Sequence, residues 1–336
     1  MRSFCLLFVP CRTGRLTNPP IAFLVTKTLF ASTLVKSPRN SGDFSSPHKK
    51  SAAQGGIDTG AMRFDNQKEV TRFILDDLSK CNNRNIADVL GKSGKVSKQN
   101  RGVSYLRTHM RAIASRIKDL TASPWTYRDI STVVYGMQCM RESDEGVLDI
   151  LTSMKHAADR NNVMKQSSIE ARSISSMLYG LRRMSSRTSG MKDFVSTIAQ
   201  SIKLSSTVFE GQSVGNALYG MQGMSSDSGE VRALVSALAG KVRECKADLN
   251  GQEVGNALYG MQGMSSDSVE VRGLVSALAG KVRESKADLS SQAVGNALYG
   301  MQGMSSDSAE VRGLVDRKST RLNSSHGKLS RMPSSA

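Results

Sequence analysis

The sequence predicts an all-α protein, built as an α-solenoid of helical hairpin repeats about 40 residues long. Two observations predict this fold. Residues 212–251 and 252–291 agree at 34 of 40 positions, and 292–315 repeats the first part of the same unit. Within each unit the apolar residues recur at helical spacing and show no strand-like alternation. One hairpin cannot bury its apolar face alone, so stacked neighbours must supply the core and form a concave and a convex surface.

Tyrosines mark the repeats. Two diverged copies lie upstream, at 130–140 and 173–184, and give five repeats within 128–315, the last one truncated. The near-identity of the last three indicates recent duplication or an assembly artefact and leaves the copy number open. The marker residues are spaced by 44, 40, 40 and 40 positions and are Tyr135, Tyr179, Tyr219, Tyr259 and Tyr299.

The first 61 residues read as a transit peptide followed by a linker. Residues 1–42 contain no Asp or Glu but many Ser, Thr, Lys and Arg, which is typical of import into a mitochondrion or plastid. Residues 37–61 are rich in Ser, Gly and Pro, as flexible linkers are. The alternatives are an untranslated leader read in frame, with the start at Met62, and a secretory signal or an unprocessed tail.

Residues 62–127 are interpreted as a diverged hairpin or an N-terminal cap. Residues 70–78 and 105–120 are expected to be helices, the second of them basic. Residues 92–101 are expected to form a basic loop, because they combine Lys and Arg with Gly and Ser.

Each repeat is expected to contain two helices, A and B. In the third repeat these are helix A at about 212–224 and helix B at about 228–246. Asp227 and Glu230 have the spacing of a capping box at the start of helix B. Three glycines inside helix A each cost about 1 kcal/mol of helix stability, so we expect them to allow a close approach of the neighbouring helix. They are Gly215, Gly220 and Gly223.

The C-terminal segment 316–336 is expected to be an artefact. Residues 316–326 read DRKSTRLNSSH and 330–336 read SRMPSSA, which are translations of a common sequencing adapter. We therefore expect Val315 to cut the last repeat inside helix B. The helix A of that repeat should then expose an apolar surface that frays or self-associates.

Composition limits the function classes. The formal net charge is +17, part of it in the two terminal segments, so the repeats are moderately basic and compatible with a polyanion partner. The five cysteines have neither disulfide-framework nor metal spacing, which favours a reducing compartment. There is no phosphate-binding loop, nucleophile elbow or cluster of metal ligands, so we expect no enzyme, no cofactor and no metal. No stretch is apolar for long enough to cross a membrane.

The helix-A string QEVGNALYGMQGM at 252–264 resembles the first helix of octotricopeptide-type repeats. It is also similar to the related apicomplexan repeats and to the repeat domain of the kinetoplastid RNA-editing substrate-binding complex 6 protein. The resemblance covers about 130–315, and this chain has Tyr where the family usually has Trp. It implies an organellar, RNA-binding α-solenoid that acts in RNA stability, processing, editing or translation, with other RNA-processing proteins as further partners.

The resemblance implies that the first helices line the concave face. Amide side chains there would suit the edges of unstacked bases in single-stranded RNA, one base per repeat. Arginines of the second repeat could contact phosphates, and basic residues gather in 92–118 and 172–203. The tyrosines could stack on bases, but packing between repeats is the preferred interpretation. The alternative function is a protein-binding scaffold of the armadillo or HEAT kind. The candidate RNA-binding residues are Gln212, Asn216, Gln222, Gln252, Asn256, Gln262, Gln292, Asn296, Gln302, Arg182 and Arg183.

Overall fold

The structure is a computed structural model that describes residues 57–59, 64, 66–99, 105–285 and 289–315. All of these residues fall within one compact unit. The expected transit peptide, the alternative start at Met62 and the adapter-like segment 316–336 lie outside the described residues.

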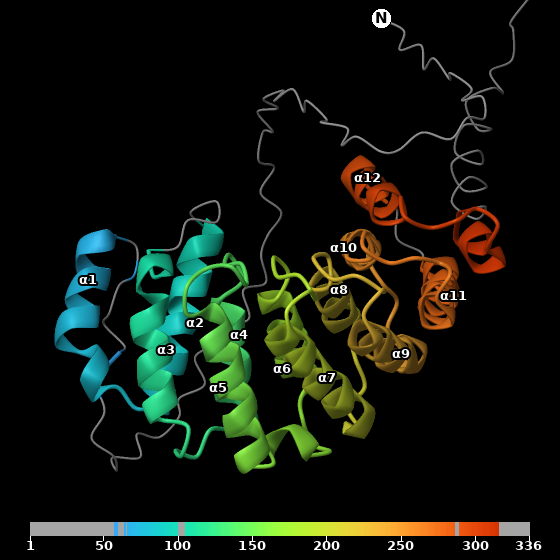
Figure 1. The fold of residues 1–336 in the computed structure, drawn as a ribbon. Coiled ribbons are helices and arrows are strands. Elements are labelled where there is room, and N and C mark those ends of the chain that lie inside the picture. The colour runs from blue at the N-terminus through green and yellow to red at the C-terminus, as the bar shows by residue number, and fades with distance from the viewer. Residues whose placement is uncertain (1–56, 60–63, 65, 100–104, 286–288, 316–336) are drawn as a thin grey trace, which may run out of the picture. The chain divides into compact units, whose positions relative to one another are not determined.

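Within the described residues the secondary structure is helical throughout, without strands, and the fold is the expected α-solenoid of helical hairpins. The helices form two layers, and each helix packs against the next member of its own layer (Figure 1). Layer A contains α2 (Asn83–Gln99), α4 (Tyr127–Gly136), α6 (Ala171–Gly180), α8 (Gly211–Tyr219), α10 (Gly251–Tyr259) and α12 (Ser291–Gly300). Layer B contains α3 (Met110–Asp119), α5 (Val147–Arg160), α7 (Ser189–Leu204), α9 (Gly229–Glu244), α11 (Val269–Glu284) and the helical residues 309–315.

The segment before the first clear repeat adds a hairpin to both layers. Helix α1 (Gln67–Asp76) precedes α2 and α3, and one-turn 3-10 helices lie at Leu78–Lys80, Arg107–His109 and Val163–Lys165. The expectation of a loop at 92–101 is wrong for residues 92–99, because they belong to α2. Packing of α2 against α4 stabilises this helix although its Gly and Ser residues have low helix propensity.

The core lies between the two layers and consists of the apolar residues that recur in each repeat. In the third repeat Val214 and Leu218 of α8 and Leu234 and Leu238 of α9 are each about 1% exposed or less. Full burial of one such side chain contributes roughly 1.5–3 kcal/mol. Because each repeat shares its core with the next, the apolar periodicity read from the sequence translates directly into stacking.

Glycines set how closely the layer A helices approach each other. A Cβ atom at Gly220 would overlap the backbone carbonyl of Leu178, and one at Gly260 would overlap that of Leu218. A Cβ at Gly215 would lie 3.2 Å from the Cα of Glu253. These contacts confirm that the small residues are required for packing.

The helix ends differ from the sequence expectation. Helix α8 ends at Tyr219 rather than Met224, because residues 220–224 form a tight turn in which the Met224 N–H donates to the Met221 carbonyl at 2.8 Å. The predicted capping box is also wrong in detail. The N-cap residue of α9 is Ser228, whose hydroxyl donates to the Glu230 carboxylate, whereas Asp227 bonds to the hydroxyl of Ser225.

Candidate nucleic-acid interface

The face of layer A that is turned away from layer B, called the outer face below, carries three columns of side chains. Gln212, Asn216 and Tyr219 are the second, sixth and ninth residues of α8, and their spacing of four and three places them on one side of the helix. Gln212 is exposed and the other two are partly exposed, while Val214 and Leu218 on the opposite side are buried. Helices α10 and α12 repeat the same residues in the same register.

The tyrosine column is a continuous stack. The rings of Tyr219 and Tyr259 lie 5.5 Å apart between centroids with an interplanar angle of 22°. The remaining pairs are separated by 5.5–6.1 Å with angles of 21–25° and join Tyr135, Tyr179, Tyr219, Tyr259 and Tyr299. Because each inner ring is covered on both faces by its neighbours, no face is left for a base, and packing between repeats is the role this geometry favours.

The amide columns differ from the tyrosines because they are not used by the fold. The side chains of Asn216, Asn256 and Asn296 are partly exposed and make no hydrogen bond to any described residue. The same is true of the three glutamines one turn earlier, Gln212, Gln252 and Gln292, which are exposed. Each amide therefore presents an acceptor and two donors outward from layer A.

The later glutamines are placed differently. Gln222, Gln262 and Gln302 lie in the turn after the helix rather than on its face. Gln262 Nε2 donates to the Tyr259 carbonyl at 3.4 Å. In the first clear repeat the corresponding residue, Gln138, is fully buried and donates to the Gly94 carbonyl at 3.0 Å. Gln138 therefore reaches the preceding helix α2, whereas Gln262 bonds within its own repeat.

The two candidate arginines, Arg182 and Arg183, differ in exposure and in their contacts with the protein. Arg182 lies over the Tyr179 ring at 4.5 Å from its centroid and donates to Gln138 Oε1 at 3.0 Å, so it is bound to the chain itself. Arg183 is exposed and makes one long hydrogen bond, 3.4 Å, to the Cys139 carbonyl. Of the pair, Arg183 is the better placed to meet an external ligand.

Several arginines of the basic segment 92–118 bind groups of the protein itself. Arg116 donates to the Cys81 carbonyl at 2.7 and 3.0 Å, Arg107 pairs with Asp144 at 3.2 Å, and Arg111 pairs with Glu145. In the recent repeats Arg232 donates to the carbonyls of Ser226 and Asp227. These arginines therefore bind carbonyl and carboxylate groups of the protein itself.

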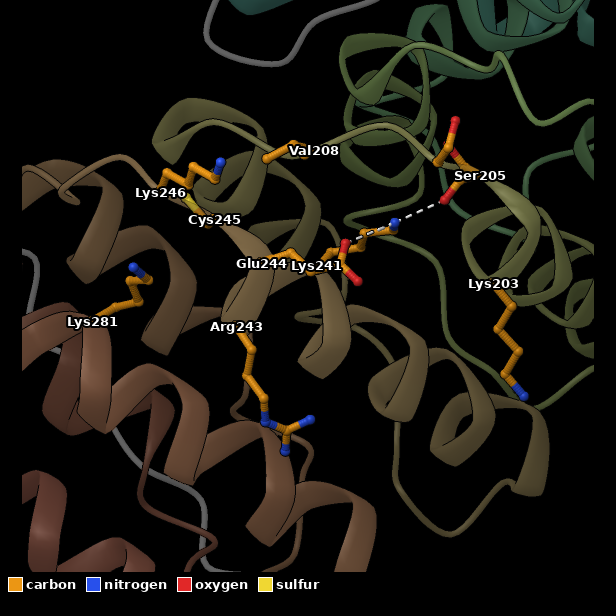
Figure 2. A pocket seen from close by; sticks show the side chains of 10 residues that line it. Lys203, Ser205, Val208, Lys241, Arg243, Glu244, Cys245, Lys246 and Lys281 are labelled. Atoms are coloured by element: carbon orange, nitrogen blue, oxygen red, sulfur yellow. Dashed lines mark hydrogen bonds and ion pairs between the residues drawn. The ribbon is translucent and has the colours of Figure 1, made fainter.

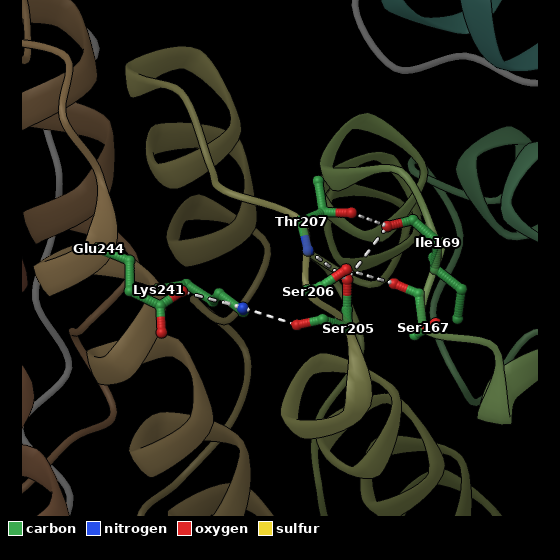
Figure 3. Close-up of polar contacts among 7 residues, drawn as sticks. All are labelled: Ser167, Ile169, Ser205, Ser206, Thr207, Lys241 and Glu244. Atoms are coloured by element: carbon green, nitrogen blue, oxygen red, sulfur yellow. Dashed lines mark hydrogen bonds and ion pairs between the residues drawn. The ribbon is translucent and has the colours of Figure 1, made fainter.

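A basic groove of about 840 Å³ lies at the C-terminal ends of α7, α9 and α11 (Figure 2). Lys241 in its wall is buried, and its Nζ lies 2.8 Å from the Ser205 carbonyl oxygen and 3.0 Å from the Glu244 carboxylate (Figure 3). Lys281 pairs with Glu284 at 3.0 Å. Cations at helix C-termini offset the helix dipole and satisfy terminal carbonyls, so part of this basic character has a structural cause.

Serine and threonine side chains also form hydrogen bonds in the segment that connects α7 to α8, beside this groove. The hydroxyls of Ser205 and Thr207 donate to the Ile169 carbonyl at 3.2 and 2.6 Å, and the Ser206 N–H donates to the Ser167 carbonyl at 3.1 Å (Figure 3). The connection between α7 and α8 is thereby tied to the one between α5 and α6.

The metal-ligating residues, the cysteines and the helix hydropathy bear on other kinds of site. Throughout the described ranges, no three His, Cys, Asp or Glu side chains are grouped as a metal site would need. The described cysteines Cys81, Cys139 and Cys245 are free and buried, and burial raises the pKa of the Cys81 thiol to about 11. None of the helices in the described part is both long and apolar enough to span a membrane.

Sequence reasoning missed one set of exposed residues on layer A. Arg84, Arg128 and Arg172 are the second residues of α2, α4 and α6, in the register of Gln212. Their spacing of 44 residues equals the spacing between Tyr135 and Tyr179, and this recurrence is visible in the sequence. The sequence prediction missed the arginines because it did not assign α2 to layer A.

Comparison with known proteins adds no further assignment. No protein-family model matches the chain, and neither a curated protein nor a solved structure matches it. The class defined by the fold is therefore the helical-repeat α-solenoid, and the octotricopeptide resemblance stays a prediction from the repeat sequence.

Proposed function

We propose that this protein binds single-stranded RNA on the outer face of layer A and acts without catalysis of its own. The observation that carries the proposal is the amide column Asn216, Asn256 and Asn296. These side chains occupy one register on one face, and no described residue forms a hydrogen bond with their amide groups. Unstacked bases present mixed donor and acceptor edges, which amides match.

The exposed glutamines Gln212, Gln252 and Gln292 extend the same surface one turn toward the helix starts. With one base per repeat, the five marked repeats would contact about five nucleotides. Such a short site suits a protein that works with further repeats or with partner proteins. A role in RNA stability, processing, editing or translation in a mitochondrion or plastid follows from the sequence resemblance and belongs to the same proposal.

The test is fluorescence anisotropy of the 336-residue chain with a random single-stranded RNA pool, at low and moderate salt. Double-stranded DNA of the same length is the competing probe. We expect submicromolar binding that prefers the RNA and weakens with salt. The N216A/N256A/N296A variant should weaken binding about 10- to 2000-fold, since three lost hydrogen bonds of roughly 0.5–1.5 kcal/mol each sum to about 1.5–4.5 kcal/mol.

The matched control is S236A/S276A, which removes exposed polar groups from α9 and α11 in layer B. It should leave RNA affinity unchanged. Absence of binding by the folded wild-type chain at low salt would overturn the proposal and favour a protein-binding scaffold.

A further inference from the structure

The arginine row Arg84, Arg128 and Arg172 is aligned by the packing of layer A. Gly136, Gly180 and Gly220 approach the carbonyls of Leu90, Val134 and Leu178, and each arginine lies six residues before the approached residue. All three arginines are exposed. The residues at this position in the next three helices are Gln212, Gln252 and Gln292.

Helix stability does not account for the row. Each arginine lies in the first turn, where the helix dipole favours acidic side chains and a cation costs roughly 0.3–1 kcal/mol. Arg84 and Arg128 form no hydrogen bond or ion pair through their guanidinium groups with any described residue. They differ in this from Arg107, Arg111 and Arg116, which are all bound to the chain.

The acidic residues nearest Arg84 and Arg128 are engaged with other groups in the described part of the chain. Asp88 accepts a hydrogen bond from Thr59 at 3.4 Å and forms no ion pair with Arg84. Asp129 is held by the capping box of α4, where it accepts from Thr126 Oγ1 at 2.7 Å. Glu170, the N-cap residue of α6, is the exposed acid beside Arg172.

We infer that Arg84, Arg128 and Arg172 bind the phosphates of the single strand, an inference that rests on the proposed function. Guanidinium groups pair with phosphate through two parallel hydrogen bonds. The row lies four residues, about 6 Å along the helix axis, before the column that contains Asn216. The backbone then runs over the first turns of layer A, and the bases lie over the middle of the helices. The arginines add backbone contacts at the N-terminal end of the solenoid, whereas α8, α10 and α12 carry Gln at the same position.

The experiment measures the salt dependence of RNA binding in three variants of the full chain. R84Q/R128Q/R172Q places in α2, α4 and α6 the residue that α8, α10 and α12 already carry, so folding should be preserved. Q212R/Q252R/Q292R makes the reverse exchange. R160Q/K203Q/K246Q removes three exposed cations at the C-terminal ends of layer B helices and is the matched control.

On single strands each neutralised phosphate contributes about 0.7 to the slope of log K against log salt. We expect the slope to fall by about two in R84Q/R128Q/R172Q, to rise by about two in Q212R/Q252R/Q292R, and to stay unchanged in the control. RNA binding by the wild type with an unchanged slope in R84Q/R128Q/R172Q, or an equal fall in the control, would overturn the inference and leave the proposed function standing. A wild-type chain that binds no RNA would overturn both.

Discussion

The N-terminal half of the solenoid (83–204) and the C-terminal half (211–315) share their packing and differ in their outer surface. Gly180 and Gly220 make the same close approach to the preceding helix, and Tyr179 and Tyr219 belong to the same stack. The second residue of the layer A helix is nevertheless Arg in one half and Gln in the other. The position of closest backbone approach is Gly in both halves, whereas the exposed second position differs between them without loss of the fold.

The turns that join neighbouring repeats show a second difference. In the N-terminal half the Glu142 carboxylate accepts hydrogen bonds from the hydroxyl and, at 3.0 Å, the N–H of Ser185. In the C-terminal half the Ser265 N–H donates to the Ser226 hydroxyl at 2.9 Å, and the Ser305 N–H donates to Ser266 at 2.8 Å. One half therefore uses a charged link and the other a neutral one.

Shared packing predicts equal sensitivity of the two halves at the glycines. Gly180→Ala and Gly220→Ala should each lower the free energy of unfolding by about 3 kcal/mol, the upper part of the overpacking range, because the added Cβ meets backbone atoms. Gly240→Ala, where a Cβ meets nothing within 4 Å, should raise it by up to about 1 kcal/mol. Urea titrations followed by circular dichroism give the comparison, and a large loss in only one half would contradict shared packing.

The tyrosine stack predicts a difference between its middle and its end. Tyr219→Ala removes two ring contacts and should cost about 2 kcal/mol, whereas Tyr299→Ala removes one contact of a 49% exposed ring and should cost about 1 kcal/mol. Thermal unfolding of both variants measures the two losses. Equal losses would mean that stacking adds little to stability.

The charged link between Glu142 and Ser185 predicts a pH dependence that the neutral serine links between repeats do not share. Burial raises the pKa of the Glu142 carboxyl, but the hydrogen bonds from Ser185 outweigh it and hold the pKa below the ordinary 4.5. The link therefore stabilises the fold above pH 4.5 and is lost as the pH falls through the lowered pKa. Glu142→Gln should cost about 1 kcal/mol at neutral pH and progressively less in acid.

Melting temperatures of wild type and Glu142→Gln, measured from neutral pH to below pH 4.5, test the prediction. Ser186→Ala is the neutral control, since it removes the acceptor of the Ser225 N–H and should have the same effect at every pH. A constant difference between wild type and Glu142→Gln would show that the carboxylate charge does not contribute.

The repeat architecture was predictable because apolar spacing and the recurrent tyrosines are local signals. Helix α2 was not, since Gly91 and Gly94 look like loop residues until Thr132 and Gly136 of α4 are packed against them. The end of helix A was misplaced for a related reason, because Met221 and Met224 continue the apolar spacing while their backbone already turns. The amide columns were found from their repetition, but only the fold separates the free Asn216 from the turn residue Gln222.

Helix α12 is the last layer A helix among the described residues, and its surface for a following helix is exposed. Leu298 in α12 is 59% exposed, whereas the corresponding Leu218 and Leu258 are 1% and 0% exposed beneath the next helix. The surface that α8 offers to α10 is thus the one that α10 offers to α12. A gene that duplicates one such unit inserts a module whose two contact surfaces already match its neighbours. Adding one more such unit would therefore need no compensating substitutions at either contact surface, and 212–251 and 252–291 already differ at only six of 40 positions.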